Sequence, residues 1–217
     1  MLRSLVGSEM CIRDRGYCEA GECRDTVMLT RVDAELAKLP AERRARGTVV
    51  VMHQMGSHGP AYFKRTPAEF KKFTPECQDT SLSQCDRAQV VNAYDNTILF
   101  TDYFLSRVID WLKTQEKTHT PAMLYVADHG ESLGEKNIYL HGLPYAVAPV
   151  EQKAVPLITW LSPGFEQLSR VTTRCLQTER HKPLSHDNLF HSVLGLMAVK
   201  TTTYQRERDF FAACEGR

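Results

Sequence analysis

The hydrophobic positions of this chain recur at helical spacing in three stretches. Apolar residues three and four positions apart predict a helix over residues 26–39, which ends where Pro40 follows. A longer amphipathic pattern predicts a second helix over residues 86–113. A third helix is expected to begin near Ser185, whose hydroxyl suits an N-cap, and to run through Met197.

Three short apolar runs are typical of β-strands: residues 48–52, 122–126 and 155–161. The first is β-branched and uninterrupted, which suits a sheet covered on both faces. Strand, helix, strand, strand, helix is the order of an α/β fold. We therefore expect a layered α/β/α sandwich with a mostly parallel central sheet. No linker divides residues 16–217, so we expect them to belong to one domain.

Composition excludes some classes of function. The chain has 217 residues and a formal net charge of +1, without a basic stripe, so nothing favours nucleic acid as a partner. Its apolar runs are far shorter than the roughly 20 residues of a membrane-spanning helix, and the chain as written is expected to be soluble. Residues 1–15 lack the apolar region of a secretory signal and are expected to be a non-native or disordered leader.

Seven cysteines are many for a cytosolic enzyme, and their spacing is not that of a zinc ribbon. Cys77 and Cys85 flank a short polar loop, and so do Cys18 and Cys23, which favours two local disulfides. Local disulfides indicate an oxidising compartment such as a periplasm. Free buried thiols are the alternative. Two further cysteines are candidates for a third pair: Cys175 and Cys214.

The strongest chemical signal follows the strand at 122–126, where Asp128 and His129 stand at its carboxyl end. Ligand sites of open α/β sheets form at such strand ends, and a carboxylate beside an imidazole suits Zn²⁺ or Mn²⁺. The alternative is a capping aspartate and a turn histidine. His58 and His141 both stand next to glycine, and either one can bind a second metal or the oxygens of a phosphate. Glu131 is either a residue that orients a ligand or a solvated acid.

The other histidines are interpreted as structural or superficial. His53, His186 and His191 are expected to be structural or capping residues, and His119 and His181 to lie on the surface. The sequence offers no convincing nucleophile, since it has neither a G-x-S-x-G elbow nor a phosphate-binding P-loop.

Several multi-residue motifs occur in an order that points to a known family. They are HQMGSHGPAY at 53–62, the cysteines at 77 and 85, YDNT at 94–97, DHGESLGE at 128–135, YLHG at 139–142 and SHDNLFH at 185–191. Together they resemble the lipid A phosphoethanolamine transferases, which include the mobile colistin-resistance enzymes. These enzymes belong to the alkaline phosphatase and sulfatase superfamily. The resemblance covers about residue 16 to the end of the sequence.

The resemblance implies an alkaline phosphatase-like fold and a zinc-dependent enzyme at the periplasmic face of the bacterial inner membrane. Such an enzyme moves phosphoethanolamine from a phosphatidylethanolamine donor to a lipid A acceptor through a threonine nucleophile. By position, Asp128 and His129 match the primary zinc ligands. His58 and His141 match histidines near the phosphoryl group, with a second zinc possible, and Glu131 falls beside them. His58 and His141 are thus expected to be catalytic and, with Glu131, to bind substrate.

The sequence departs from the family pattern in one respect. The family's threonine nucleophile, an acidic zinc ligand and its membrane domain lie upstream of every motif matched here. We therefore expect the C-terminal part of a catalytic domain, truncated on its N-terminal side, inactive alone and associated with the membrane through the missing domain. The alternatives are a sulfatase-like hydrolase or phosphoglycerol transferase of the same superfamily, or a catalytically silent metal-binding module.

Overall fold

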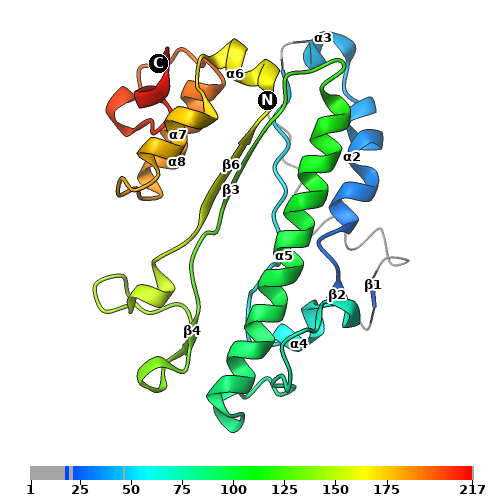
Figure 1. Ribbon diagram of the computed structural model, residues 1–217, viewed down its shortest axis with the longest axis vertical. Helices are drawn as coiled ribbons and strands as arrows, with labels where there is room; N and C mark the ends of the chain where they lie inside the picture. Colours follow the sequence, from blue (N-terminus) through cyan, green and yellow to red (C-terminus); the bar gives the residue numbers. More distant parts are fainter. Residues whose placement is uncertain (1–17, 20–21, 46, 217) are drawn as a thin grey trace. The chain divides into compact units, whose positions relative to one another are not determined.

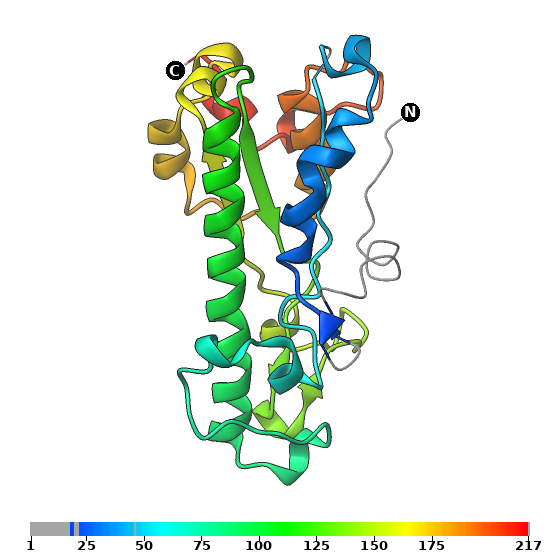
Figure 2. The ribbon, with the colours of Figure 1, turned by 90° about the vertical axis from the view of Figure 1, so that its right-hand side faces the viewer.

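The computed structural model describes residues 18–19, 22–45 and 47–216 (Figure 1). The chain forms two compact units. Unit 1 comprises the described residues up to Val108 and returns for Glu131–Lys153, whereas unit 2 comprises Ile109–Gly130 and the described residues from Ala154 onward. Helix α5 (Arg87–Gln115) passes from the first unit into the second as one unbroken helix, which Figure 2 shows. The leader expected at residues 1–15 lies outside the described residues.

Unit 1 consists of short elements around the first part of α5. They are β1 (Cys18–Glu19), β2 (Glu22–Cys23), α2 (Val27–Ala37), α3 (Ala41–Arg44), α4 (Tyr62–Arg65), β4 (Ser132–Leu133) and β5 (Tyr139–Leu140), with 3-10 turns η2 (Ala68–Phe70), η3 (Leu82–Gln84), η4 (Glu135–Asn137) and η5 (Val150–Gln152). β1 pairs antiparallel with β2, and β4 pairs antiparallel with β5. α2 confirms the helix expected over residues 26–39, and its buried side chains are Val27, Met28 and Val32.

The core of unit 1 lies where α4 and α5 meet the β4–β5 hairpin. Its buried members are Tyr62, Cys77, Leu82, Val90 and Ala93, and side chains of β4 and β5 pack against them. A disulfide joins Cys77 to Cys85 and confirms that local pair. Cys23 is also disulfide-bonded, whereas the side chain of Cys18 is outside the described set. This core holds the hairpin against the segment that carries Tyr62.

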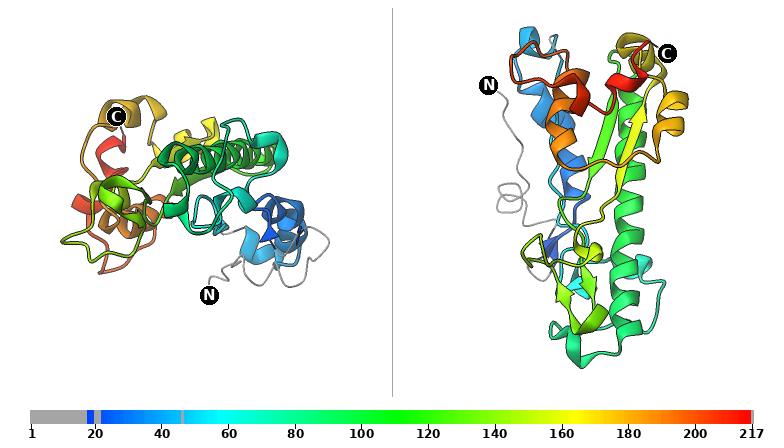
Figure 3. Two further views of the ribbon diagram at one scale, coloured as in Figure 1. Left: turned by 90° about the horizontal axis from the view of Figure 1, so that it is seen from below. Right: turned by 90° about the vertical axis from the view of Figure 1, so that its left-hand side faces the viewer.

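Unit 2 is built on one pair of strands. β3 (Ala122–Val126) and β6 (Leu157–Leu161) lie side by side along their whole length, as Figure 3 shows, with Ala122 opposite Leu161 and Val126 opposite Leu157. Its further elements are α6 (Pro163–Ser169), α7 (Thr173–Glu179), α8 (Asp187–Leu196), η6 (Arg206–Arg208) and η7 (Ala212–Cys214). Phe211 and Cys214 are buried in its core, where a disulfide joins Cys214 to Cys175.

Two features of the predicted sheet differ from the structure. β3 and β6 are antiparallel, as are the other two strand pairs that the structure describes, whereas a mostly parallel sheet was expected. A parallel pair needs a crossover that returns the chain to the starting edge, usually an α-helix. The connection between β3 and β6 contains only the β4–β5 hairpin and 3-10 turns, so β6 runs back along β3.

Residues 48–52 do not form a strand. None of the strands among the described residues pairs with them, and Val51 is 50% exposed. A β-branched run favours extended backbone, but a strand also needs a second chain to complete its hydrogen bonds.

The ends of the helices of unit 2 were only partly anticipated. α8 begins one residue later than expected, with His186 rather than Ser185 at its N-cap. No helix was expected directly after the strand at 155–161. Ser162 in fact caps α6 by accepting a hydrogen bond from the N–H of Phe165, with Pro163 in the first turn.

No helix in the described ranges is both long and apolar enough to cross a membrane.

Candidate metal centre

Glu131 is a buried carboxylate at the start of the β4–β5 hairpin, and its side chain is only 4% exposed. Its Oε1 accepts a hydrogen bond from the backbone N–H of Gly59 at 3.1 Å, and its Oε2 accepts one from the hydroxyl of Tyr62 at 3.3 Å. Oε1 also lies 3.1 Å from Nδ1 of His141. A buried charge with three such partners is satisfied and fixed in place.

Tyr62 contributes a fully buried hydroxyl to this network. Burial, and then the nearby charge of Glu131, raises the pKa of its phenol well above the ordinary value. Tyr62 therefore keeps its proton and remains a hydrogen-bond donor to the Glu131 carboxylate.

Gly59 allows the segment that carries His58 to approach the hairpin closely. A Cβ at this position would lie 2.3 Å from Cδ2 of Leu140 and 2.7 Å from the hydroxyl oxygen of Tyr62. Only a residue without a side chain fits there without a shift of its neighbours. The rings of His58 and His141 are consequently brought edge to face, with their centroids 4.9 Å apart.

The hydrogen-bond partners of His58 and His141 fix which ring nitrogen carries the proton. Nδ1 of His58 lies 2.7 Å from the carbonyl oxygen of Gly59, which can only accept, so Nδ1 donates. Nδ1 of His141 faces the Glu131 carboxylate in the same way. In each neutral imidazole the proton is on Nδ1, and Nε2 carries the lone pair that a metal binds.

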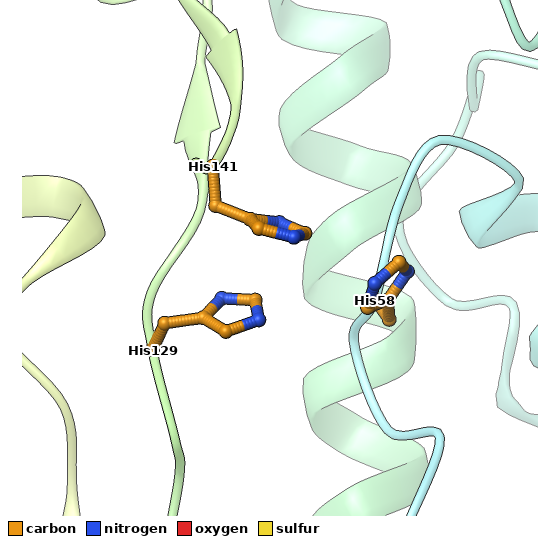
Figure 4. Close-up of side chains that lie close together, drawn as sticks. All are labelled: His58, His129 and His141. Atoms are coloured by element: carbon orange, nitrogen blue, oxygen red, sulfur yellow. The ribbon is translucent and has the colours of Figure 1, made fainter. Parts of the chain in front are cut away.

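His129 follows the same rule. Its Nδ1 lies 3.0 Å from the carbonyl oxygen of Gly130, so this ring also has Nε2 as its acceptor atom. Only Gly130 separates His129 from Glu131, so chain connectivity ties its position to that of the hairpin. His58, His129 and His141 offer ligand atoms within 4.8 Å of one another, and Figure 4 shows these three side chains.

Asp128 is placed differently from the three histidines. Its side chain is 79% exposed, and it is not a member of the group that gathers within 4.8 Å. Its Oδ1 accepts the N–H of His129 at 3.0 Å, and its Oδ2 lies 3.8 Å from Nε2 of the same residue. The carboxylate is thus adjacent to Nε2 of His129 without belonging to the cluster.

The structure brings together some of the site residues that the sequence predicted and separates others. Of the residues expected to bind metal or substrate, the structure gathers His129 with His58 and His141, and it leaves Asp128 at their edge. Glu131, expected to bind substrate, is buried and turned toward protein donors. Its burial favours the orienting role that was the other possibility for this residue.

The donor set of this cluster fits zinc. Zn²⁺ binds neutral imidazole nitrogen, and catalytic sites have about three protein ligands with one position open. Three imidazoles, each with its proton placed on the far nitrogen by a carbonyl or carboxylate oxygen, match that requirement. The Asp128 carboxylate is close enough to His129 to serve as an additional hard ligand.

Four of the remaining histidines, His119, His181, His186 and His191, behave as the sequence predicted. His186 donates from Nε2 to the carbonyl oxygen of Ala127 at 2.8 Å and so holds the end of β3. His191 is buried, and its Nδ1 accepts the backbone N–H of Gln205. His119 and His181 are exposed, and both predictions are confirmed.

Sequence reasoning missed Gly59 and Tyr62 as parts of this site. Both belong to the motif at residues 53–62, but no local pattern tells that they meet a carboxylate about 70 residues further along the chain.

A family model described as "Sulfatase" matches residues 6–199, which is most of the chain. The chain belongs to the sulfatase family. Among curated members it is 43% identical over 201 residues to phosphoethanolamine transferase EptA of Salmonella typhimurium, covering 92% of this chain and 36% of that protein. It is also 42% identical over 190 residues to phosphatidylethanolamine transferase Mcr-1 of Escherichia coli, covering 88% of this chain and 33% of that protein.

A solved structure of the family confirms the α/β, alkaline phosphatase-like fold. The integral membrane protein lipooligosaccharide phosphoethanolamine transferase A of Neisseria meningitidis superposes with a TM-score of 0.87 at 39% identity. The match covers 95% of this sulfatase-family chain and 38% of that one. The chain thus spans about a third of the length of the relatives it matches.

Proposed function

We propose that this chain supplies the histidine part of the metal and phosphate site of a zinc-dependent phosphoethanolamine transferase. The observation that carries the proposal is the cluster of His58, His129 and His141, each with its Nδ1 next to a hydrogen-bond acceptor. The names of the relatives support phosphoethanolamine as the group transferred.

Zinc, when bound, would polarise a phosphoryl oxygen and lower the pKa of an attacking hydroxyl. His129 would hold the metal through Nε2, with Asp128 beside it as a carboxylate ligand. His58 and His141 would complete this centre or hold a second metal. Glu131 would keep His141 in the tautomer that has its lone pair on Nε2.

A direct contact of His58 or His141 with phosphate is the second possibility. In the tautomer described above, Nε2 accepts hydrogen bonds and does not donate them, so it would repel an unprotonated phosphate oxygen. Such a contact needs a second proton on the ring. Metal binding needs no such change, and it is therefore the role we assign to both residues.

The relatives and the disulfides suggest substrates and a location. We propose phosphatidylethanolamine as the donor and lipid A as the acceptor, at the periplasmic face of the bacterial inner membrane. Phosphatidylethanolamine occurs in the name of Mcr-1, and the Neisseria structure is named as an integral membrane protein and a lipooligosaccharide phosphoethanolamine transferase, which supports this choice of lipids and location. Disulfides such as Cys77–Cys85 persist in oxidising compartments, which supports a periplasmic location.

We further propose that the 217 residues are inactive alone. The motifs that this chain matches do not include the family's threonine nucleophile or its acidic zinc ligand. Zinc should therefore bind, held by imidazoles and Asp128, but phosphoethanolamine should not be transferred. A catalytically silent metal-binding module, the alternative reading, predicts the same behaviour for the isolated chain: zinc binding without transfer.

The test has a binding part and an activity part. Zinc affinity of the 217-residue chain would be measured by competition with a chromogenic chelator. His129→Ala should lose more than the roughly 10–100-fold that removal of an outer partner costs. The matched control is His181→Ala, an exposed histidine outside the cluster. Equal affinity of both variants would refute the metal centre.

For activity, the matched region of the Salmonella relative would be replaced with this chain. Mass spectrometry of lipid A then shows whether phosphoethanolamine is added, and His129→Ala should abolish the addition. Unchanged transfer by that variant would exclude the proposed role. Offering phosphatidylglycerol or a sulfate ester to the same chimera tests the phosphoglycerol transferase and hydrolase alternatives.

A further inference from the structure

His58 is the last residue of a tight turn over residues 55–58, and one backbone hydrogen bond lies within that turn. The backbone N–H of His58 donates to the carbonyl oxygen of Met55 at 3.2 Å. Gly56 has a φ of +52°, a left-handed conformation that non-glycine residues rarely adopt. The turn at residues 55–58 thus sets the direction in which the His58 ring leaves the backbone.

Asp25 holds this turn from a distant part of unit 1. Its Oδ1 accepts the N–H of Met55 at 2.9 Å, and its Oδ2 accepts the N–H of Gly56 at 2.9 Å. The two oxygens of one carboxylate thereby clamp two consecutive amides about 30 residues away. Charge-assisted hydrogen bonds of this kind are stronger than neutral ones, and the paired geometry restricts the turn in two directions.

The carboxylate itself has a fixed position. Asp25 lies between β2 and α2, two residues after the disulfide-bonded Cys23 and directly before Thr26, the N-cap of α2. Its backbone carbonyl accepts the N–H of Met28 in the first turn of that helix. Asp25 thus connects the start of α2, through its backbone, to the turn at residues 55–58, through its carboxylate.

Keeping a charge at this place has a cost. Burial raises the pKa of Asp25, and the hydrogen bonds from Met55 and Gly56, with the positive charge of Arg65, oppose that rise. An asparagine would be easier to bury. It offers only one acceptor oxygen, however, and its NH₂ group would face one of the two amides.

We propose that Asp25 is a positioning residue for the metal centre, which holds the turn at residues 55–58 so that His58 reaches His129 and His141. The inference rests on the proposed function in that it takes His58 as a metal ligand. Asp25 is not one of the three clustered histidines and is not proposed to contact a substrate. Its loss should change metal binding through His58 and through no other ligand.

The first experiment compares four forms of the 217-residue chain: wild type, Asp25→Asn, His58→Ala and the double variant. Zinc affinity is measured by chelator competition, and Co²⁺ absorption in the visible range reports the number of nitrogen ligands. Asp25→Asn should weaken zinc binding about 10–100-fold and shift the Co²⁺ spectrum toward that of His58→Ala. The double variant should bind no more weakly than His58→Ala, because both changes remove the same ligand. Losses that simply multiply would overturn the proposal.

Asp209 supplies the matched control for a general loss of structure. It is a buried carboxylate in unit 2 that accepts a backbone N–H from Phe211 and a hydroxyl hydrogen bond from Tyr204. Asp209→Asn should lower the thermal midpoint while leaving zinc affinity and the Co²⁺ spectrum unchanged. Equal effects of Asp25→Asn and Asp209→Asn on zinc binding would show that Asp25 acts only on stability, which contradicts the positioning role. Asp25→Glu retains both oxygens and should recover part of the affinity.

A readout without metal separates this inference from the proposed function. In ¹⁵N NMR of the metal-free chain, Asp25→Asn should move the ring signals of His58 and leave those of His181 in place. Moved His58 signals in a chain that binds no zinc would support the positioning role and count against the metal centre. Unmoved His58 signals would overturn the positioning role whatever the metal does.

Discussion

Nδ1 of His141 lies 3.1 Å from Oε1 of Glu131, a carboxylate whose side chain is only 4% exposed. This pair joins a buried carboxylate to an imidazole whose other nitrogen belongs to the proposed zinc site. In that site the carboxylate would orient the ring and make Nε2 a stronger ligand.

Glu131→Gln should therefore weaken zinc binding about 10–100-fold. The amide keeps one acceptor oxygen, but its NH₂ group has to face either the N–H of Gly59 or the hydroxyl of Tyr62. Chelator competition measures the change. The matched control is Glu135→Gln on the same hairpin, where the carboxylate pairs with Arg87. If both variants bind zinc equally well, Glu131 does not orient a ligand.

Gly59→Ala should destabilise the chain by about 1–3 kcal/mol, because the new methyl group has to displace Leu140 and Tyr62. Urea unfolding would give the difference. Gly142→Ala is the control that separates a steric clash from an unfavourable backbone conformation. Its Cβ meets nothing within 4 Å, and only the positive φ of +100° is unfavourable. The steric explanation predicts that zinc affinity falls in Gly59→Ala, because that methyl group lies next to His58.

Zinc should stabilise the folded chain by mass action. At a free concentration 100 times the dissociation constant, one site adds about 2.7 kcal/mol, which should raise Tm by several degrees. A chelator should reverse the gain. Thermal melts of wild type and His129→Ala, each with and without zinc, test this. A zinc-dependent shift of the same size in His129→Ala would place the metal elsewhere.

Tyr204 should ionise later than an ordinary tyrosine. Burial, followed by its hydrogen bond to Asp209, raises the pKa of this phenol to about 12. The unfolded chain loses the proton near pH 10, so the stabilising effect is present below that pH and is lost as the pH rises from 10 to 12. Absorbance at alkaline pH, compared with Tyr204→Phe, should show one late-ionising phenol missing from the variant. An unchanged titration curve would contradict the assignment.

Long periodic segments allowed the three longest described helices, α2, α5 and α8, to be predicted. α5 was located within two residues at each end, because its apolar pattern continues over many turns. Its buried face was harder to predict. Ile98 belongs to the apolar pattern of this helix but is 45% exposed, whereas Val90 and Ala93 are buried. Apolar side chains cover so much of the circumference of this helix that the period alone does not select one face.

Strand pairing could not be read from the sequence in the same way. β3 matched its predicted range because its composition is strand-like and β6 lies beside it. Residues 48–52 have a similar composition, but no strand in the described part of the chain pairs with them. A helix satisfies its own backbone, whereas a strand depends on a second segment that local pattern does not identify.

In the candidate site, too, local sequence patterns identified individual residues but not the contacts between distant segments. Glycine neighbours and strand ends indicated His58, His129 and His141. The contacts of Asp25 with Met55, and of Tyr62 with Glu131, join residues 30 and 69 positions apart. Nothing in the local sequence distinguishes Asp25 from an ordinary acid at the start of a helix.

The positions of two disulfides in the chain favour one order of oxidation. Cys77 and Cys85 lie within unit 1 and are eight residues apart, whereas Cys175 pairs with Cys214 within unit 2. At about 5–20 residues per second, Cys85 is synthesised on the order of ten seconds before Cys214. Once the early pair has closed, its two sulfurs are no longer open to the later thiols. Among these four cysteines, the direction of synthesis thus favours the native pairing over the other two.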